Sequence, residues 1–202
     1  MKILIACEFS GVVRDIMIAA GHDAMSCDLL ATDRPGPHYQ GNVLDILDDG
    51  WDLMIAHPPC TYLTNAGVRH LHSIPSRNGV VTKIHGLERW QFMFEAAEFF
   101  KKLLEAPIEK IAVENPIPHK YAVEAIGRKY DQLIQPWQFG HGERKATCFW
   151  LKNLPHLKPT RIVKGRYPRV HLESPGPDRW KKRSITYKGI ARAMAQQWTK
   201  NY

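Results

Sequence analysis

Short apolar segments alternate along this chain with segments of helical periodicity, and this alternation restricts the folds that the chain can adopt. Strands are predicted at residues 2–7, 23–27, 39–40, 52–56 and 109–113. Helical segments are predicted between them at about residues 11–20, 43–47, 87–106 and 121–126. Strands connected by helices in this order predict an α/β protein with a doubly wound, mostly parallel sheet.

The carboxyl-terminal third departs from this alternation. Residues 132–137 and 145–151 are predicted to be strands of a closing antiparallel hairpin across Gly140-His141-Gly142. An apolar stripe from Ile190 to Trp198 predicts a last helix. The 202 residues contain no repeat and no clear boundary, so we expect one domain over residues 1–202.

The composition excludes several classes of protein. No apolar run approaches the ~18–20 residues of a membrane span, and Glu8 follows the apolar start where a signal peptide would have small residues. We therefore expect a cytoplasmic protein with no membrane partner, monomeric or weakly dimeric. The four cysteines form no C-x-x-C pair, so neither structural disulfides nor a four-cysteine zinc site is expected.

Most of the net charge of +8 lies in one segment, residues 152–183. Between Lys158 and Arg183 nine basic residues stand against two acidic ones, which gives +7. The stretch from Lys158 to Arg183 also contains four prolines, Tyr167 and Trp180. Such a segment is attractive to a polyphosphate backbone, but it is equally typical of a solvated loop, and composition leaves the choice open.

Cys60 is the strongest candidate for a catalytic residue. It follows the apolar run 53–56 and the stiff dipeptide Pro58-Pro59, at a strand end where ligands collect in open α/β sheets. The alternative is a buried, inert cysteine, which describes Cys7, Cys27 and Cys148 well. Arg69, His70 and His72 follow in the polar loop 61–85, and they are expected to favour the reactive thiolate of Cys60.

Glu114 follows a second buried strand, with Asn115 beside it. Burial favours the protonated form of a carboxyl group, which can then donate a proton to a ring nitrogen. The alternative is a carboxylate that caps the next helix. A thiol and a carboxyl group at neighbouring strand ends together predict attack on an electron-poor ring.

The first strand-to-helix turn is a weaker candidate for a cofactor site. Phe9-Ser10-Gly11 offers an aromatic wall and backbone N–H groups at a helix start, but the dinucleotide fingerprint G-x-G-x-x-G is absent. Asp28 ends the second strand, where an acid commonly binds ribose hydroxyls, although a plain turn aspartate fits equally well. No metal site is expected, because His70 and His72 lack a fourth ligand beside Cys60.

Taken together, these residues resemble the cytosine-5 DNA methyltransferases, and in particular small methylase-like proteins of phages and prophages. Pro58-Pro59-Cys60 is similar to the nucleophile motif, and Val113-Glu114-Asn115 is similar to the Glu-Asn motif. Phe9-Ser10-Gly11, Asp28-Leu29 and Gly41-Asn42-Val43 resemble the three motifs for S-adenosylmethionine. Arg144 and Lys145 fall at the base- and phosphate-contacting motif, and residues 184–195 resemble the last motif.

The resemblance implies a Rossmann-like methyltransferase fold, S-adenosylmethionine as cofactor and DNA as partner. It implies catalytic roles for Cys60, Glu114 and Arg144. Cofactor contacts are expected from Phe9, Ser10, Gly11, Asp28, Leu29, Asn42, Val43 and Pro59, and substrate contacts from Pro58, Asn115, Arg69 and Lys145. The loop 61–85 is expected to close over a flipped cytosine and to supply cations through Arg69, Arg77 and Lys83.

The chain also departs from the family. Asn42 stands where an aspartate is usual, Pro116 replaces a valine, and only about residues 152–183 take the place of a large target-recognition region. Two other hypotheses therefore stay open. One is a pyrimidine nucleotide C5-methyltransferase, and the other is a non-catalytic nucleic-acid-binding protein on a methyltransferase scaffold.

Overall fold

A computed structural model describes residues 1–72 and 85–200 of the chain. Its centre is a seven-stranded sheet of order β3-β2-β1-β4-β5-β7-β6. The strands are β1 (Lys2–Ala6), β2 (Asp23–Asp28), β3 (His38–Gln40), β4 (Leu53–Ala56), β5 (Lys110–Asn115), β6 (Gln132–Ile134) and β7 (Thr147–Lys152). Strand β7 runs antiparallel to both of its neighbours, and the other paired strands are parallel. The α/β class, the Rossmann-like doubly wound sheet and the antiparallel closure are confirmed.

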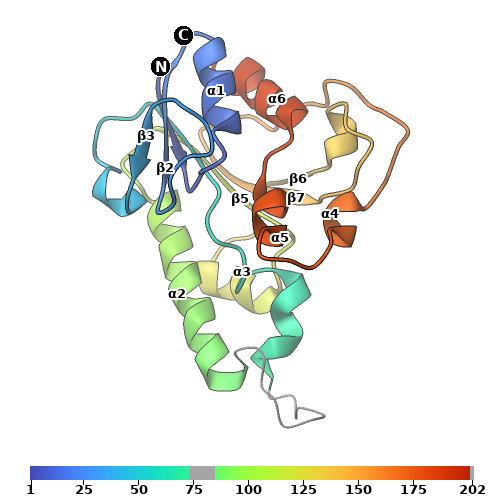
Figure 1. Cartoon of the computed structure of the whole chain (residues 1–202). Helices are drawn as coiled ribbons and strands as arrows, with labels where there is room; N and C mark the ends of the chain where they lie inside the picture. The colour runs from blue at the N-terminus through green and yellow to red at the C-terminus, as the bar shows by residue number, and fades with distance from the viewer. Residues whose placement is uncertain (73–84, 201–202) are drawn as a thin grey trace.

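Helices cover both faces of the sheet (Figure 1). Helices α2 (Gly86–Leu104) and α3 (Lys120–Ile126) pack on one face, and α1 (Val12–Ala19) and α6 (Lys188–Trp198) pack together on the other. Strand β1 supplies both cores, because Leu4 faces the first layer while Ile3 and Ile5 face the second. Each such buried side chain contributes roughly 1.5–3 kcal/mol, so this strand ties the two layers together.

The remaining elements are short. They are the 3-10 helices η1 (Val43–Asp45), η2 (Asn65–Leu71) and η3 (Pro136–Gln138), and the helices α4 (Arg169–Leu172) and α5 (Arg179–Ser184). Helices α4 and α5 form inside the basic segment and η2 forms inside the polar loop 61–85, where the sequence patterns predict no helix. The predicted strand 132–137 ends early as β6, because Pro136 has no N–H group for a sheet ladder and instead begins η3.

The start of α6 is held against the loop before β7. The amide of Gly189 donates to His141 Nε2 at 2.9 Å, and a side chain at position 189 would come within 1.9 Å of the Phe139 carbonyl oxygen. Only a glycine fits this approach, so Gly189 brings the segment before α6 close to the carboxyl ends of the parallel strands.

The strand order reverses between β1 and β4, which lie side by side. The loops that follow these two strands leave in opposite directions, so a crevice opens at their carboxyl ends. This crevice holds the candidate site. Among the described helices, none has the length and apolar character required to span a bilayer.

Candidate active site

A cavity of about 300 Å³ lies at the carboxyl ends of β1, β2, β4 and β5. One end is lined by the turn after β1 and by Asp28, and the other by the Pro-Pro-Cys turn and Glu114. Residues of the carboxyl-terminal segment close it, namely Lys145, Trp180, Arg183, Ser184, Ile185 and Thr186. A larger, shallow groove of about 680 Å³ runs along α2, but its walls contain no nucleophile.

The local backbone presents Cys60 to this cavity. The chain continues the ladder for one residue after β4, because the His57 amide donates to the Ala6 carbonyl at 2.9 Å. Pro58 and Pro59 have no N–H groups and end the pairing. The Cys60 carbonyl then accepts hydrogen bonds from Leu63 and Thr64, at 3.1 and 3.2 Å. These bonds close a tight turn that holds the cysteine at the cavity wall.

The electrostatics of Cys60 differ from the prediction. Burial raises the pKa of the Cys60 thiol and the nearby Glu114 raises it further, while Lys145 and Arg183 lower it. The cations that act on the thiol are therefore Lys145 and Arg183, and not Arg69, His70 or His72. The prediction for these three residues was wrong, because Arg69 and His70 lie in η2 and His72 directly after it, outside the cavity lining.

The other three cysteines are poorer nucleophiles. Burial raises the pKa of Cys7 far above its usual range, and it raises the pKa of Cys27 and of Cys148 to about 12. All four thiols are free of disulfides. Only Cys60 combines cavity exposure with two nearby cations.

Glu114 enters the cavity from β5, where it pairs with Phe149 of β7. Its side chain is 17% exposed, and its Oε2 lies 3.6 Å from His57 Nδ1. The neighbouring Asn115 is buried, and its amide nitrogen donates to the Pro116 carbonyl at 2.6 Å. Its Oδ1 has no hydrogen-bond partner in the described part of the chain.

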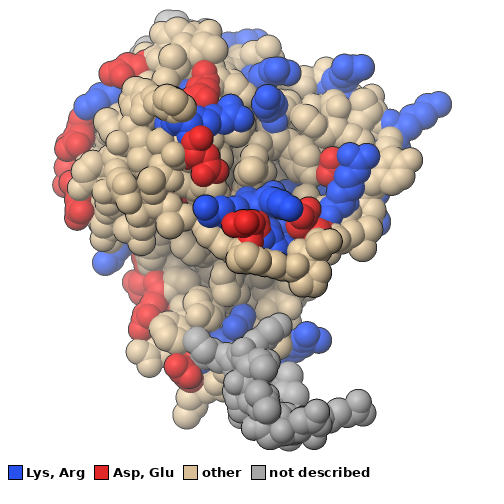
Figure 2. Space-filling view, viewed as in Figure 1, with Lys and Arg blue, Asp and Glu red and all other residues tan. Residues whose placement is uncertain are grey.

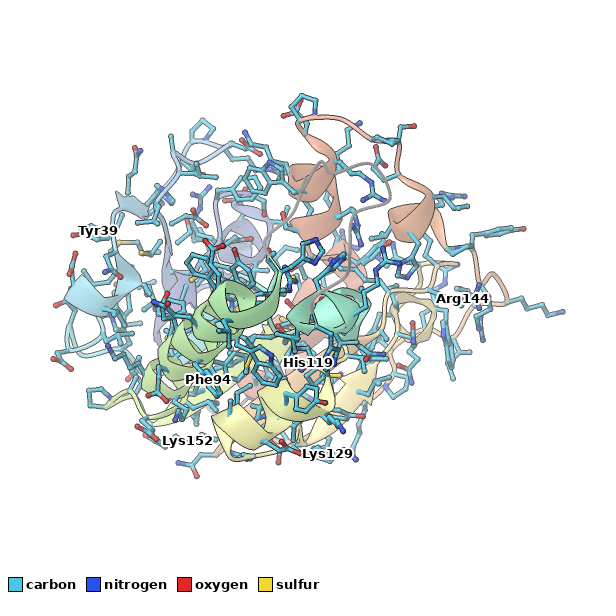
Figure 3. The ribbon with its side chains drawn as sticks, turned by 90° about the horizontal axis from the view of Figure 1, so that it is seen from below. Tyr39, Phe94, His119, Lys129, Arg144 and Lys152 are labelled. Atoms are coloured by element: carbon cyan, nitrogen blue, oxygen red, sulfur yellow. The ribbon has the colours of Figure 1, made fainter. Side chains whose placement is uncertain are left out.

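Lys145 and Arg144, neighbours in sequence, lie in different surroundings. Lys145 lines the cavity, and its ammonium group donates to the Ile185 carbonyl at 3.3 Å. Burial lowers the pKa of Lys145, whereas the charges of Glu114 and Cys60 raise it. Arg144 is exposed, does not line the cavity and lies at the outer edge of the molecule (Figure 3). Lys145 therefore occupies the place near the thiol that the motif suggested for Arg144.

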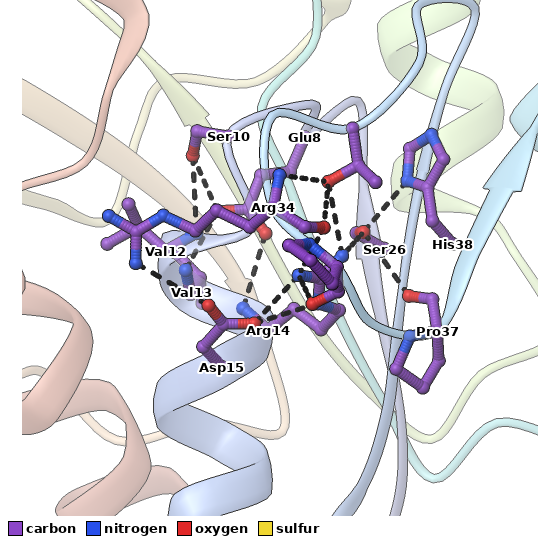
Figure 4. Close-up of polar contacts among 12 residues, drawn as sticks. Glu8, Ser10, Val12, Val13, Arg14, Asp15, Ser26, Arg34, Pro37 and His38 are labelled. Carbon is purple, nitrogen blue, oxygen red and sulfur yellow. Dashed lines mark hydrogen bonds and ion pairs between the residues drawn. The ribbon is translucent and has the colours of Figure 1, made fainter.

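The turn after β1 is built differently from the expected amide site. Glu8 turns its carboxylate onto the start of α1, where Oε1 accepts from the Val13 amide at 2.8 Å and Oε2 from the Arg14 amide at 3.2 Å. The Ser10 hydroxyl also donates to Glu8, at 3.0 Å (Figure 4). These first-turn amides are thus satisfied within the protein, and the expectation that they are open to a ligand was wrong.

A buried guanidinium fixes the loop beside this turn. Arg14 is 0% exposed and donates to the side chains of Asp15, Ser26 and Thr32 (Figure 4). It also donates to the carbonyls of Arg34 and Pro35, both at 3.2 Å. Gly11, at φ 67°, lies against it, and a side chain there would meet Arg14 at 2.6 Å. This network makes the structure rigid beside the cavity end that is lined by the turn after β1 and by Asp28.

Not all predicted cofactor residues gather at the cavity. Phe9, Ser10, Asp28 and Pro59 line it, as does Pro58, which was predicted to contact the substrate. The other predicted cofactor residues lie outside its lining: Gly11 lies against Arg14, Leu29 is 73% exposed, Val43 is in the core, and Asn42 caps η1 by accepting from the Leu44 amide at 3.1 Å.

The cations predicted to contact the substrate from the polar loop 61–85 are not found in the cavity lining that the described residues form. Arg69 belongs to η2 and donates to His70 at 3.3 Å, outside the cavity lining. Arg77 and Lys83 lie outside the described residues. No group of three or more metal-ligating side chains occurs among the residues that the structure describes.

Sequence reasoning missed His57 and Trp180 as cavity residues. Trp180 projects from α5, and its ring centroid lies 5.6 Å from that of Phe9. His57 precedes two prolines at a strand end, which was a usable signal. For Trp180 the only signal was an aromatic residue among cations.

Comparisons with known proteins find structural matches at low sequence identity. No protein-family model and no curated protein matches the sequence. The chain is similar to a prophage-encoded Escherichia coli protein described as a DNA modification methyltransferase, at 15% identity and a TM-score of 0.45, over 80% of this chain and 51% of that one. It is also similar to the Entamoeba histolytica methyltransferase EhMeth, at 11% identity and a TM-score of 0.46, over 80% of this chain and 57% of that one. The chain thus spans little more than half the length of either protein.

Proposed function

We propose that the protein transfers a methyl group from S-adenosylmethionine to C5 of cytosine in DNA. The observation that carries the proposal is the position of Cys60 and Glu114 on one cavity of about 300 Å³, whose other end has an aromatic ring and an acid at the end of β2. Addition of a thiolate to C6 of a pyrimidine, with a proton supplied at N3, needs this pair of groups.

The residues at the cofactor end fit S-adenosylmethionine. Asp28 stands where a carboxylate accepts from ribose hydroxyls, and Phe9 offers its ring to a sulfonium cation. Glu8 adds a nearby negative charge. When bound, the cofactor supplies an electrophilic methyl group. Because the first amides of α1 are bound to Glu8, the methionine carboxylate must find its partners elsewhere, and Lys145 and Arg183 are the cations that line the cavity.

The reaction assigns one role to each residue of the other end. Cys60 Sγ bonds to C6 as Glu114 gives a proton to N3, which makes C5 nucleophilic toward the methyl group. Loss of the C5 proton to water and breakage of the C6–Sγ bond then restore the thiolate, while the N3 proton returns to Glu114. Lys145 and Arg183 stabilise the thiolate before attack, because they lower the pKa of Cys60.

The basic segment supports a polymeric substrate. Helix α5 carries Arg179, Lys181, Lys182 and Arg183, and Figure 2 shows Lys and Arg side chains gathered over α4 and α5 with acidic side chains beside them. Trp180 and Arg183 of the same helix line the cavity. A phosphate backbone held on α5 would therefore lie next to Cys60.

The test is methyl transfer itself. Purified protein, labelled S-adenosylmethionine and DNA containing cytosine should yield 5-methylcytosine, and bisulfite sequencing of DNA from expressing cells should report its sequence context. Cys60→Ser should lose activity by roughly 10³-fold or more while retaining its circular dichroism spectrum. A wild-type protein that labels neither single- nor double-stranded DNA would contradict the proposal.

A free cytidine nucleotide is the second candidate substrate. It is favoured by the size of α4 and α5, which have only four and six residues, too short to lie along a major groove. Competition between dCMP and DNA separates the two. Methylation of dCMP that excess DNA does not inhibit would favour the nucleotide.

A further inference from the structure

We propose that His57 and Glu114 share one proton and act together as the acid that protonates the target ring. This inference rests on the proposed function, and it assigns His57 a role that the Pro-Pro-Cys and Glu-Asn motifs do not include. His57 would be a positioning and proton-supplying residue that acts through Glu114.

The geometry of the pair carries the proposal. His57 Nδ1 lies 3.6 Å from Glu114 Oε2, which is ion-pair distance, and the two side chains are only 11% and 17% exposed. The other ring nitrogen of His57, Nε2, is buried without a hydrogen-bond partner in the described part of the chain. A buried polar atom without a partner costs free energy, so Nε2 retains the capacity to bond to a substrate or a water.

His57 and Glu114 line two cavities. They line the main cavity with Cys60, and they line a small inner cavity of about 10 Å³ behind it, together with Lys145, Thr147 and Tyr187. That volume is close to the space that one water needs. The imidazole is thus placed between the carboxyl group and a second polar space.

Several charged and titratable groups surround the pair. Lys145 faces the carboxyl group from the loop before β7, and the Cys60 thiol faces it from the turn after β4. Arg183 reaches the same space from α5, and Tyr187 borders the inner cavity. A proton on His57 Nδ1 would lie within reach of the Glu114 carboxylate.

The proton balance is closed. As the Cys60 Sγ–C6 bond forms, the one proton held between His57 Nδ1 and Glu114 passes through Glu114 to N3. When the C6–Sγ bond breaks, that proton returns from N3 to the pair. The proton lost from C5 leaves separately to water. No electron is gained or lost by the protein.

Two substitutions separate position from proton supply. His57→Asn keeps a hydrogen-bonding group near the position of Nδ1 but carries no ionisable proton, and His57→Gln moves the amide toward the position of Nε2. We expect His57→Asn to lose about tenfold or more of the methyl-transfer rate and to have a pH–rate profile that differs from that of the wild type, because the carboxyl group alone must then hold the proton. His156→Asn, an exposed histidine outside the cavity, is the matched control.

Two outcomes of this experiment would overturn the proposal. An unchanged pH profile in His57→Asn would show that the imidazole only positions Glu114. Equal losses in both variants at every pH would indicate a purely structural role.

A second measurement does not depend on activity. In ¹⁵N spectra, the His57 Nδ1 resonance should move in Glu114→Gln relative to the wild type, because the carboxylate beside that nitrogen is removed. An unmoved resonance would overturn the shared proton. A coupled pair in a wild-type protein without methyl transfer would overturn the catalytic role through the failure of the proposed function, and it would leave the pair itself established.

Discussion

The two ends of the central cavity differ in whether the buried polar groups beside them have hydrogen-bond partners. At the cofactor end, Glu8 accepts two backbone amides and a hydroxyl group, and the Arg14 guanidinium donates to three side chains and two carbonyls. At the nucleophile end, His57 Nε2 is buried without a partner among the described residues, as is Oδ1 of Asn115, which follows Glu114 in β5 but does not line the cavity. The first end is saturated and serves as scaffold, while the second keeps hydrogen-bonding capacity that a substrate can use.

This contrast indicates where binding energy is available. A saturated network stabilises the fold but has little to offer a ligand, since each donor already has its acceptor. An unpaired buried group destabilises the free protein and is relieved when a ligand supplies a partner. Substitutions at the two ends should therefore affect different measurements.

The largest expected effect is on stability, at the cofactor end. Arg14→Met should lower the free energy of unfolding by about 2–4 kcal/mol, because it leaves one buried and several partly buried oxygen acceptors without this donor. Urea denaturation measures this. The matched control is Arg34→Met, since Arg34 is 44% exposed and reaches the same Asp15 at 3.5 Å; it should change stability by less than about 1 kcal/mol. Equal losses would remove the distinction between the two arginines.

A smaller effect is expected on the reactivity of Cys60. Glu114 raises the pKa of this thiol and Lys145 lowers it. At a pH near 8, Glu114→Gln should therefore speed alkylation of Cys60 by iodoacetamide several-fold, and Lys145→Met should slow it several-fold. Peptide mass spectrometry follows the modification of each cysteine, with Cys27 and Cys148 as internal references. Rates that do not move in opposite directions would contradict the charge arrangement.

The smallest expected effect concerns the aromatic contact that joins the basic segment to the cofactor end. Trp180→Ala should weaken S-adenosylmethionine binding by about two- to tenfold, the range for an aromatic pair worth ~0.5–1.5 kcal/mol. Trp180→Phe should recover most of the loss, and Leu172→Ala on α4 serves as the exposed control. Calorimetric titration measures all three. Unchanged binding in Trp180→Ala would separate α5 from the cofactor end.

Local patterns were enough to predict the elements that bury apolar surface. The apolar run 53–56 ends at two prolines, and both the strand and the position of Cys60 at its end follow from local rules. The same rules placed Glu114 at a neighbouring strand end. They failed at Pro136, where one missing N–H group outweighed an apolar pattern, and in the basic segment, where α4 and α5 bury no residue fully.

The sequence by itself determined the order of strands and helices and placed Cys60 and Glu114 at neighbouring strand ends, because periodicity and strand ends are properties of neighbouring residues. Only the tertiary structure decided which cations reach Cys60, that Glu8 occupies the start of α1, and that His57 meets Glu114. These contacts join elements that are distant along the chain, and their partners are set by packing across the sheet and by burial. Packing across the sheet and burial cannot be read from a local sequence pattern.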